Sequence, residues 1–281
     1  MKPAPFAYVK AAALDQVLDL LVRHGDEARL LAGGQSLIPS LNLRLAAPAL
    51  LIDINGLDEL AGIALEGGTL RIGALTRHRT IEQSGEIARH APLLAQAMPY
   101  VAHPAIRNRG TLGGSIALAD PAAELPACAL ALDARIELRG PAGPRAVAAS
   151  AFFRGLYETD LRPDEVVTAI SIRTPEACHR SAFAELARRH GDYALAGLAA
   201  HARVDGGTLH DVRLVFFGIG SRPTLAPTAG AVLESGAGDL PAALAADLEP
   251  LADLQAGAGT KLHLAAVLAA RVVAELTGAP H

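Results

Sequence analysis

Cysteine, tryptophan and a surplus of either charge are what this sequence lacks most clearly. Only two cysteines occur among its 281 residues, Cys128 and Cys178, and they form no CxxC motif. The chain therefore lacks the four thiolate ligands that an iron–sulfur cluster needs, and so few cysteines are typical of a reducing compartment. A formal net charge of −4 offers no basic surplus for a polyanion, so we expect no nucleic-acid partner.

Long apolar runs are absent as well. No stretch reaches the roughly 18 apolar residues of a membrane-spanning helix, and the start, MKPAPFAYVK, lacks the apolar core of a signal peptide. We therefore expect a cytoplasmic protein without a membrane span. Hydrophobic residues make up 51% of the chain, which is enough to bury a sizeable core in one large domain or in two or three small ones.

The motifs of several enzyme classes are missing too. There is no GxSxG and no HExxH, which argues against serine hydrolases and zinc proteases. The ten histidines are scattered without ligand spacing, and His78 and His103 are expected on the surface or in loops. Gly218 starts a GxGxxG-like stretch, but Pro223 stands where the third glycine is required, so a dinucleotide-binding Rossmann fold is not indicated.

The hydrophobic pattern predicts helices and strands that do not alternate strictly, which favours an α+β fold. Helical spacing of apolar residues begins at Leu14 and is stopped by Gly25, and the tail from Leu262 to Leu276 has one apolar helical face. Expected strands lie at 29–32, 49–54, 63–65, 70–72, 135–138, 166–172, 181–187, 194–204 and 212–218. Thr76 is expected to cap a helix that runs through Ile81. Further helices are expected at 86–100 and 122–132, and a loop at 103–115.

The most informative segment follows an expected strand and precedes residues 38–45, which can be helical. It consists of Ala32, Gly33, Gly34, Gln35, Ser36 and Leu37. Paired glycines allow positive φ and close approach of the backbone to a ligand, and successive N–H groups at such a turn form an anion-binding concavity. The Ser36 hydroxyl adds a donor. Taken alone, the segment fits a plain turn with a helix cap equally well.

A second segment has the same ingredients, with paired glycines between two hydroxyl residues. It consists of Thr111, Leu112, Gly113, Gly114 and Ser115. Two basic residues, Arg107 and Arg109, stand just upstream, as would suit a phosphate ligand. The segment is therefore a second candidate for binding a diphosphate.

Two carboxylates follow the second segment closely. Asp120 and Glu124 are well placed to accept hydrogen bonds from ribose or ribityl hydroxyls, as the acidic residue of dinucleotide folds does. Asp120 is followed by Pro121, so a helix N-cap explains it as well, and both roles are compatible.

Together the two glycine segments resemble a known family. AGGQSLIPSLNLRL and RNRGTLGGSIALADPAAELPA are similar to the medium, flavin-binding subunits of the xanthine dehydrogenase and carbon monoxide dehydrogenase family. The resemblance extends to IGALTRHRTIE, FFRGLYETDLRPDEVVTAI and ARRHGDYALAG, and so covers most of the chain in the family's order and spacing. Several long motifs in register are far more specific than either glycine pair alone.

The resemblance implies a fold and a site. The fold would be the two-lobed FAD-binding fold of the vanillyl-alcohol-oxidase (PCMH) type, with lobes at 1–56 and 57–175 and a C-terminal α+β domain at 178–281. Both glycine segments would bind the FAD diphosphate and its neighbours, with Glu124 and Asp120 near the sugar region. The resemblance also places Val101, Leu161 and Tyr193 at the flavin site, with the Leu161 backbone and the Tyr193 ring next to the isoalloxazine.

The implied function is electron transfer. Substrate would be oxidised at a molybdenum cofactor on a large partner, and electrons would pass through [2Fe-2S] clusters on a small partner to non-covalent FAD on this chain, then to NAD+, a quinone or oxygen. The complex would be a dimer of heterotrimers, and no residue of this chain would be catalytic. One departure concerns a lysine that many relatives carry just before ARR, because Ala184, Glu185 and Leu186 stand there instead.

Two other functions compete with this one. A self-sufficient FAD oxidase of the vanillyl-alcohol type would need a substrate domain with acid–base residues, and none is evident. A nucleotide-binding scaffold without enzyme activity would need only the two glycine segments.

Overall fold

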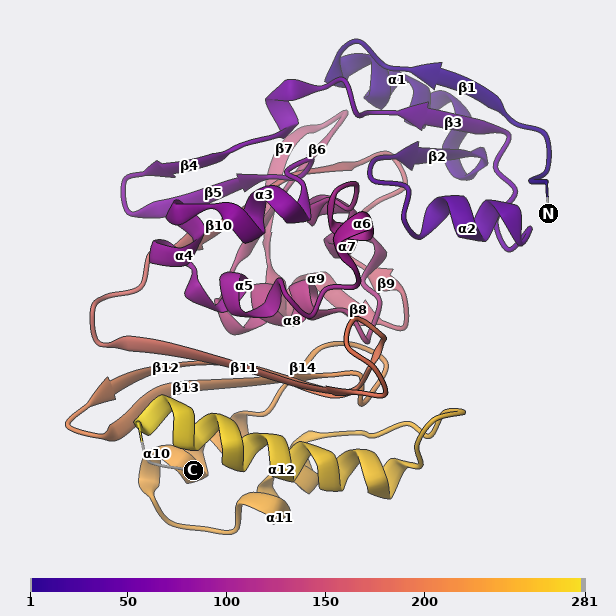
Figure 1. Cartoon of the computed structure of the whole chain (residues 1–281). Coiled ribbons are helices and arrows are strands. Elements are labelled where there is room, and N and C mark those ends of the chain that lie inside the picture. The colour runs from indigo at the N-terminus through magenta and orange to yellow at the C-terminus, as the bar shows by residue number, and fades with distance from the viewer. Residues whose placement is uncertain (1, 279–281) are drawn as a thin grey trace.

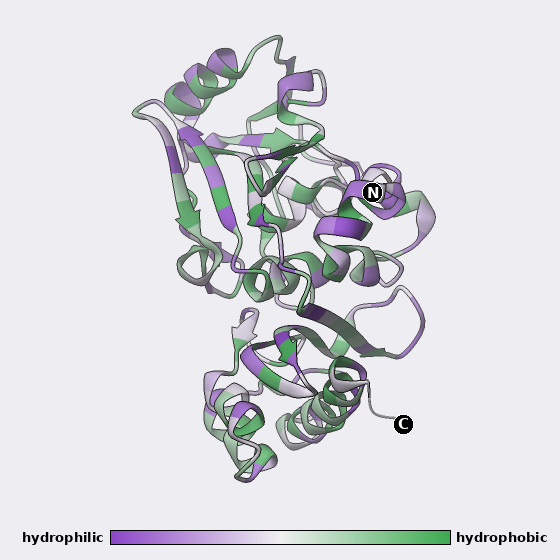
Figure 2. Cartoon of the chain, turned by 90° about the vertical axis from the view of Figure 1, so that its left-hand side faces the viewer, coloured by the Kyte–Doolittle hydropathy of each residue, from purple (hydrophilic) through white to green (hydrophobic). Residues whose placement is uncertain are grey.

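The computed structural model describes residues 2–278, which form three main sheets from the N-terminal to the C-terminal end (Figure 1). The first sheet has the order β1-β3-β2 and is parallel throughout. Its strands are β1 (Ala7–Lys10), β3 (Leu50–Asp53) and β2 (Ala28–Leu31), and its helices are α1 (Leu14–His24) and α2 (Leu37–Asn42). Polar and apolar residues alternate along α1 (Figure 2), which buries Val17, Leu18 and Leu21 against this sheet.

The middle sheet is antiparallel, with the order β4-β5-β10-β6-β7. Its strands are β4 (Ile63–Glu66), β5 (Thr69–Gly73), β10 (Val166–Arg173), β6 (Arg135–Gly140) and β7 (Gly143–Ala148). A row of β-branched residues crosses all five strands in register: Ile63, Ile72, Ile170, Ile136 and Val147. Such cross-strand pairs stabilise a sheet, and this row belongs to the main hydrophobic core.

Seven helices of the described chain lie on one side of the middle sheet (Figure 1). They are α3 (His78–Gln83), α4 (Gly85–His90), α5 (Pro92–Ala97), α6 (Pro104–Arg107), α7 (Leu112–Leu118), α8 (Glu124–Ala131) and α9 (Ala149–Phe152). A short hairpin of β8 (Phe153–Gly155) and β9 (Glu158–Thr159) follows α9.

The C-terminal sheet has the order β11-β12-β13-β14. It consists of β11 (His179–Ala187), β12 (Ala194–Asp205), β13 (Thr208–Phe217) and β14 (Thr224–Leu225), followed by α10 (Pro227–Ser235), α11 (Leu240–Asp247) and α12 (Ala258–Thr277). Both faces of this sheet are buried. Leu198 and Leu214 pack in the core beneath α12, whereas Phe183 and Phe217 join the core of the middle body. The C-terminal part is thus continuous with the middle one.

The α+β class is confirmed, and most expected elements lie within a few residues of their predicted positions. The loop expected at 103–115 is wrong, since α6 and the start of α7 occupy it. The helix expected over 86–100 is divided into α4 and α5 at Pro92. Thr76 does not cap α3, because its hydroxyl donates to the Gly62 carbonyl instead.

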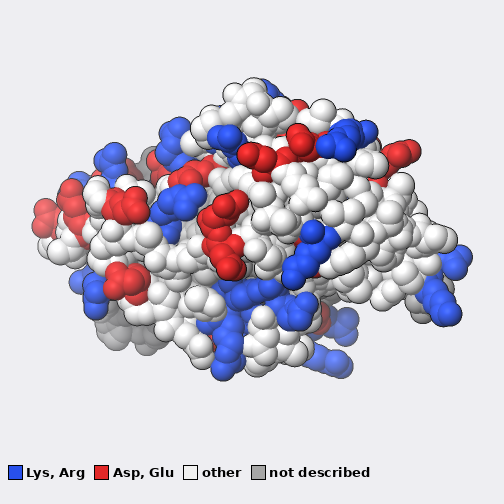
Figure 3. Space-filling model, turned by 90° about the horizontal axis from the view of Figure 1, so that it is seen from above, with Lys and Arg blue, Asp and Glu red and all other residues white. Residues whose placement is uncertain are grey.

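Charge is spread over the surface in both signs. Seen from above, the N-terminal part carries acidic side chains beside basic ones, with several basic residues gathered near the middle of that face (Figure 3). Within residues 2–278, no helix combines the length and the hydropathy that crossing a membrane requires.

Candidate functional site

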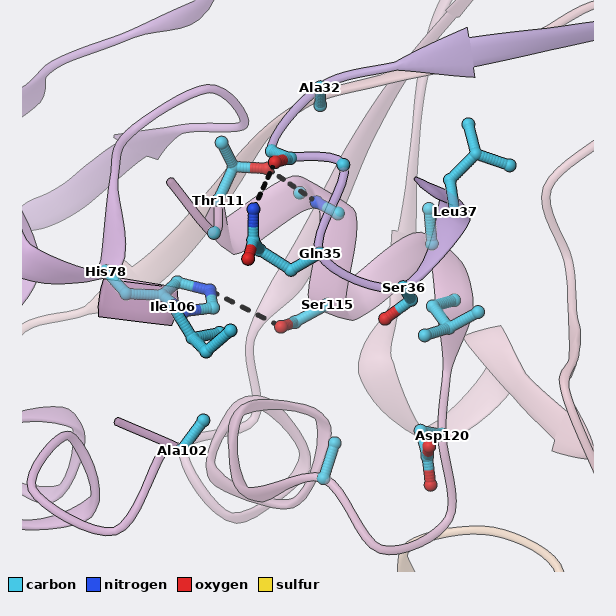
Figure 4. Close-up of a pocket in the computed structure, with 18 of the residues that line it drawn as sticks. Ala32, Gln35, Ser36, Leu37, His78, Ala102, Ile106, Thr111, Ser115 and Asp120 are labelled. Atoms are coloured by element: carbon cyan, nitrogen blue, oxygen red, sulfur yellow. Dashed lines mark hydrogen bonds between the residues drawn. The ribbon is translucent and has the colours of Figure 1, made fainter. Parts of the chain in front are cut away.

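A cavity of about 760 Å³ lies where the N-terminal sheet, the helices of the middle body and the loop before β12 meet. Its lining comes from stretches that are far apart in the sequence, around residues 32–37, 101–118, 120–124 and 191–193. Cofactor and small-molecule sites typically have volumes of roughly 300–1,000 Å³. Figure 4 shows side chains of both glycine segments facing this space, with Asp120 at the opposite end from His78.

The first glycine segment is an open turn between β2 and α2. Gly34 has a φ of +73°, which side-chain-bearing residues rarely adopt. Within the described chain, the backbone N–H groups of residues 33–36 make no hydrogen bond. The carbonyl of Gly33 accepts from the Gln35 amide at 2.8 Å (Figure 4), and the Asn55 amide donates to the carbonyl of Ala32 at 2.9 Å. The turn is therefore held through its carbonyls, which leaves its N–H groups available to an anion.

The second glycine segment is the first turn of a helix. Thr111 is the N-cap of α7, and its Oγ1 accepts from the Gly114 N–H at 3.2 Å. The Gly113 N–H donates to the Ala74 carbonyl at 2.8 Å and the Leu112 N–H to the Thr76 carbonyl at 3.1 Å. The three N–H groups are thus already engaged, and this segment presents the exposed surface of Gly114 and the Ser115 side chain to the cavity.

The two segments touch each other. A Cβ added to Gly33 would lie 2.5 Å from the Arg109 carbonyl oxygen and 2.8 Å from the Gly110 Cα. The Arg77 guanidinium joins them further, because it donates to the Arg109 carbonyl and, at 2.7 Å, to Asn55 Oδ1. Close backbone contact between distant segments therefore builds one wall of the cavity.

Neither arginine upstream of the second segment lines the cavity, since Arg109 is exposed to solvent and Arg107 is buried elsewhere. Arg107 is buried and forms two 3.0 Å hydrogen bonds to the Glu82 carboxylate, with further bonds to the carbonyls of Val101 and Ala102. It therefore holds α6 to α3 and the preceding loop, and Arg107 does not line the cavity.

His78 lies in the cavity wall, contrary to its expected place on the surface. Its side chain is 5% exposed, and burial lowers its pKa to about 4, so the imidazole is neutral. Its Nε2 lies 3.4 Å from the Ser115 hydroxyl, and no partner of Nδ1 is found among the described residues. Apart from the position of His78 in the IGALTRHRTIE motif, the sequence gave no indication that this histidine lines the cavity.

Two carboxyl groups, those of Asp120 and Glu124, line the cavity at the end away from His78, which we call the acidic end. Asp120 Oδ1 accepts from the Ala122 N–H at 2.9 Å, which forms a local turn; the helix N-cap is Ala123, so the capping role considered for Asp120 is wrong. Burial raises the pKa of Glu124 to about 7, and the nearby Asp120 charge adds to this. Burial likewise raises the pKa of Glu185 to about 8, with a contribution from Glu124.

Every residue predicted for the site lines the cavity except Leu112. Leu112 is 1% exposed and points into the main core, as its place in the first turn of α7 requires. Tyr193 is 63% exposed at the cavity edge, and Leu161 follows β9. Residues that sequence reasoning missed include His78, Ile106 and Asp192. They come from helices and loops whose approach to the cavity depends on long-range packing.

Comparison with known families matches nearly the whole chain. Residues 4–175 match the FAD binding domain in molybdopterin dehydrogenase, and residues 181–276 match the CO dehydrogenase flavoprotein C-terminal domain. Among curated proteins, the 6-hydroxypseudooxynicotine dehydrogenase complex subunit alpha of Paenarthrobacter nicotinovorans is 42% identical over 79% of this chain and 75% of its own length. The carbon monoxide dehydrogenase medium chain of Afipia carboxidovorans is 38% identical over 86% of this chain and 84% of its own.

Solved structures agree with these matches. A chain of the carbon monoxide dehydrogenase from Hydrogenophaga pseudoflava superimposes with a TM-score of 0.96 at 36% identity, covering 100% of both chains. A chain of quinoline 2-oxidoreductase from Pseudomonas putida 86 gives a TM-score of 0.89 at 35% identity, again over 100% of both. The chain therefore belongs to the family of flavin-binding subunits of the molybdopterin dehydrogenases.

Proposed function

We propose that this chain is the FAD-binding electron-transfer subunit of a molybdenum-containing hydroxylase or dehydrogenase. The observation that carries the proposal is the meeting of both glycine segments at one cavity, in a member of this flavoprotein family. When bound, FAD supplies the redox chemistry, and the protein supplies binding, orientation and electrostatics.

The residues of the cavity fit FAD. The N–H groups of residues 33–36 and the Ser36 hydroxyl suit a diphosphate. Gly114 and Ser115 line the same cavity and add surface for the ligand. Asp120 and Glu124 are acceptors, or in the protonated state a donor, for sugar hydroxyls.

In this proposal, the flavin ring lies at the end of the cavity that Leu161 and Tyr193 line. Val101 is a further residue of the cavity wall. Tyr193 is exposed enough to meet an external electron acceptor. No residue is assigned a catalytic role, since binding and orienting the flavin is all that its own redox chemistry requires of the chain.

We propose a three-part division of the chain, with FAD held between lobes at 1–56 and 57–175 and covered by a C-terminal domain at 178–281. The three sheets, each with its own helices, support this division. A cytoplasmic location is part of the proposal and rests on the free thiols of Cys128 and Cys178.

The chain works in a complex in this proposal. Its relatives are named as medium chains or complex subunits, so the molybdenum cofactor and the [2Fe-2S] clusters are assigned to a large and a small partner. We propose a dimer of heterotrimers. The comparisons do not favour a self-sufficient oxidase of the vanillyl-alcohol type, because the relatives are parts of assemblies.

Two measurements test the proposal. The purified chain should be yellow and should release all its flavin into the supernatant on acid precipitation, because binding is non-covalent. Expressed alone, it should not oxidise heteroaromatic, aldehyde or aryl-CoA substrates, and co-expression with both partners should restore turnover. A colourless chain that also refuses FAD in titration would overturn the FAD assignment, and turnover by the lone chain would support the free oxidase.

A further inference from the structure

The hairpin β8–β9 reaches the acidic end of the cavity through one side chain. Its two turn residues are Leu156 and Tyr157, since Gly155 pairs with Glu158. The Tyr157 hydroxyl donates to Asp120 Oδ2 at 3.2 Å. Asp120 lines the cavity, and its other oxygen already accepts from the Ala122 N–H.

The backbone of Tyr157 is in a conformation that a bulky residue rarely adopts. Its φ is +55° at the second turn residue, a position where glycine or asparagine is usual in turns of this handedness. Residues held in such conformations persist where the surroundings require them, and they cluster at ligand sites. The turn explains the positive φ, but it does not explain why a tyrosine occupies this position in place of glycine or asparagine.

The base of the hairpin is fixed firmly. Arg145 forms ion pairs with Asp160 and with Glu165, and it donates to the Asp160 carbonyl at 2.7 Å. The Asp160 N–H donates to the Phe152 carbonyl at 2.8 Å, and Phe152 is fully buried. The tip, by contrast, is exposed at Leu156 and Tyr157, so the hydrogen bond to Asp120 is what ties it to the cavity wall.

The backbone that carries Asp120 is fixed as well. Ala119 ends α7 in the left-handed region, with a φ of +51°, and the Pro121 carbonyl accepts from the Gly218 N–H of the C-terminal part at 2.7 Å. With its backbone held and one oxygen bonded to Ala122, the remaining freedom of the carboxylate is removed by Tyr157.

We propose that Tyr157 is a positioning residue of the flavin site, whose phenol orients the Asp120 carboxylate toward the cavity. The inference rests on the proposed function, because it takes the ligand of Asp120 to be a hydroxyl of FAD. Burial and the nearby Asp120 raise the pKa of Tyr157 to about 12, and Tyr193 contributes, so the phenol stays protonated and donates at neutral pH. Burial, together with the nearby Asp120 charge, also raises the pKa of Tyr193. Tyr193 lines the cavity, while Tyr157 contacts Asp120 in the cavity wall.

The chain provides a matched control. Arg203 Nε donates to the Asp211 carboxylate at 3.2 Å, the same length as the bond from Tyr157 to Asp120. Neither Arg203 nor Asp211 lines the cavity. Arg203→Met therefore removes a hydrogen bond of the same length to a carboxylate away from the site.

The test measures the affinity of the flavin-free chain for FAD by fluorescence quenching. Tyr157→Phe should weaken binding roughly threefold to tenfold, the loss expected for one hydrogen bond to a charged group at a partly exposed site, whereas Arg203→Met should leave it unchanged. In an Asp120→Asn background, Tyr157→Phe should have little further effect, because the phenol acts through that carboxylate. Circular dichroism of the bound flavin should change with Tyr157→Phe and not with Arg203→Met.

A second variant separates positioning from folding. Tyr157→Gly relieves the strained turn, so the flavin-free protein should unfold at the same or a higher temperature while binding FAD more weakly than Tyr157→Phe does. Equal affinity of Tyr157→Phe and the unmodified chain, or an undiminished effect in the Asp120→Asn background, would overturn the inference. Failure of the unmodified chain to bind FAD would instead overturn the proposed function.

Discussion

The two Gly-Gly segments look alike in the sequence, yet glycine serves a different purpose in each. At residues 33–34 it permits a left-handed turn, with Gly34 at a φ of +73°, and the N–H groups of that turn have no acceptor in the described chain. At residues 113–114 the N–H groups are already bonded, and glycine makes room: a Cβ on Gly113 would lie 2.5 Å from the Cβ of Ala74. One segment offers donors to a ligand, while the other allows α7 to pack on the end of β5.

We expect the largest effect from Gly33→Val, which adds a side chain where the two segments are in contact. Its Cβ would collide with backbone atoms of Arg109 and Gly110, which cannot turn away as a side chain could. FAD affinity should fall on the order of 100-fold or more, equivalent to roughly 3 kcal/mol. Titration of the flavin-free variant with FAD measures this.

Gly34→Val should weaken binding similarly, because its φ is unsuited to a β-branched residue. Gly85→Ala is the control, since a Cβ there meets nothing within 4 Å. Full flavin occupancy in a folded Gly33→Val protein would refute the role assigned to the contact between the two segments.

Gly113→Ala should act on folding before it acts on the ligand. The added methyl group meets Ala74 at 2.5 Å and should lower the free energy of unfolding by roughly 1–3 kcal/mol. Gly114→Ala should be milder, because its Cβ approaches only the Thr111 hydroxyl, at 2.8 Å. Urea denaturation of the flavin-free proteins measures both.

Gly259→Ala in α12 is the matched control for these helical substitutions, since a Cβ at this position meets nothing within 4 Å. It should stabilise the chain by roughly 0.5–1 kcal/mol through helix propensity alone. If Gly113→Ala proves as stabilising as Gly259→Ala, close packing against Ala74 is not the reason for glycine at position 113.

The acidic end beyond the second segment predicts a pH dependence that the first segment does not share. Burial raises the pKa of Glu124 to about 7 and of Glu185 to about 8, both well above the ordinary 4.5. The folded state therefore binds more protons than the unfolded state between about pH 4.5 and pH 8, and stability falls as pH rises through that window.

Glu185→Gln should flatten this dependence and raise the unfolding temperature at pH 8. Discounted for the partial exposure of Glu185, the gain is on the order of 1 kcal/mol. Unfolding temperatures of the flavin-free variant between pH 5 and pH 9 provide the measurement, with the exposed Glu66→Gln as control. If the unfolding temperature of Glu185→Gln falls with pH as steeply as that of the unmodified chain, burial does not raise the pKa of Glu185.

The smallest expected effects are those of removing the hydroxyl groups of Thr111 and Ser36, one acting on stability and the other on FAD binding. Thr111→Ala removes the N-cap of α7 and should cost about 1 kcal/mol of stability. Ser36→Ala should leave stability unchanged, because Ser36 makes no capping bond, and should weaken FAD binding by about 1 kcal/mol for one hydrogen bond. Thermal unfolding without flavin and FAD titration distinguish the two outcomes, and the reverse pattern would contradict the comparison.

Much of the fold could be predicted locally, because the information lies within a few residues. The apolar, β-branched run of β10 and the apolar face of α12 mark their structure directly. A loop was wrongly predicted for 103–115 because glycine and proline are typical of loops. In the structure, Pro104 occupies the first position of α6, and Gly113 and Gly114 lie in the first turn of α7. Both residue types are tolerated at helix starts.

By itself, the sequence determined the fold class, most helices and strands, the family and a set of site residues of which all but Leu112 line the cavity. Only the tertiary structure decided which role each residue has. Whether an N–H group is free, as in residues 33–36, or engaged, as in Gly113, depends on an acceptor from elsewhere in the chain. The burial of His78 and the contact of Tyr157 with Asp120 likewise join distant segments. Spacing along a chain encodes local periodicity, whereas partners across a cavity are set by packing.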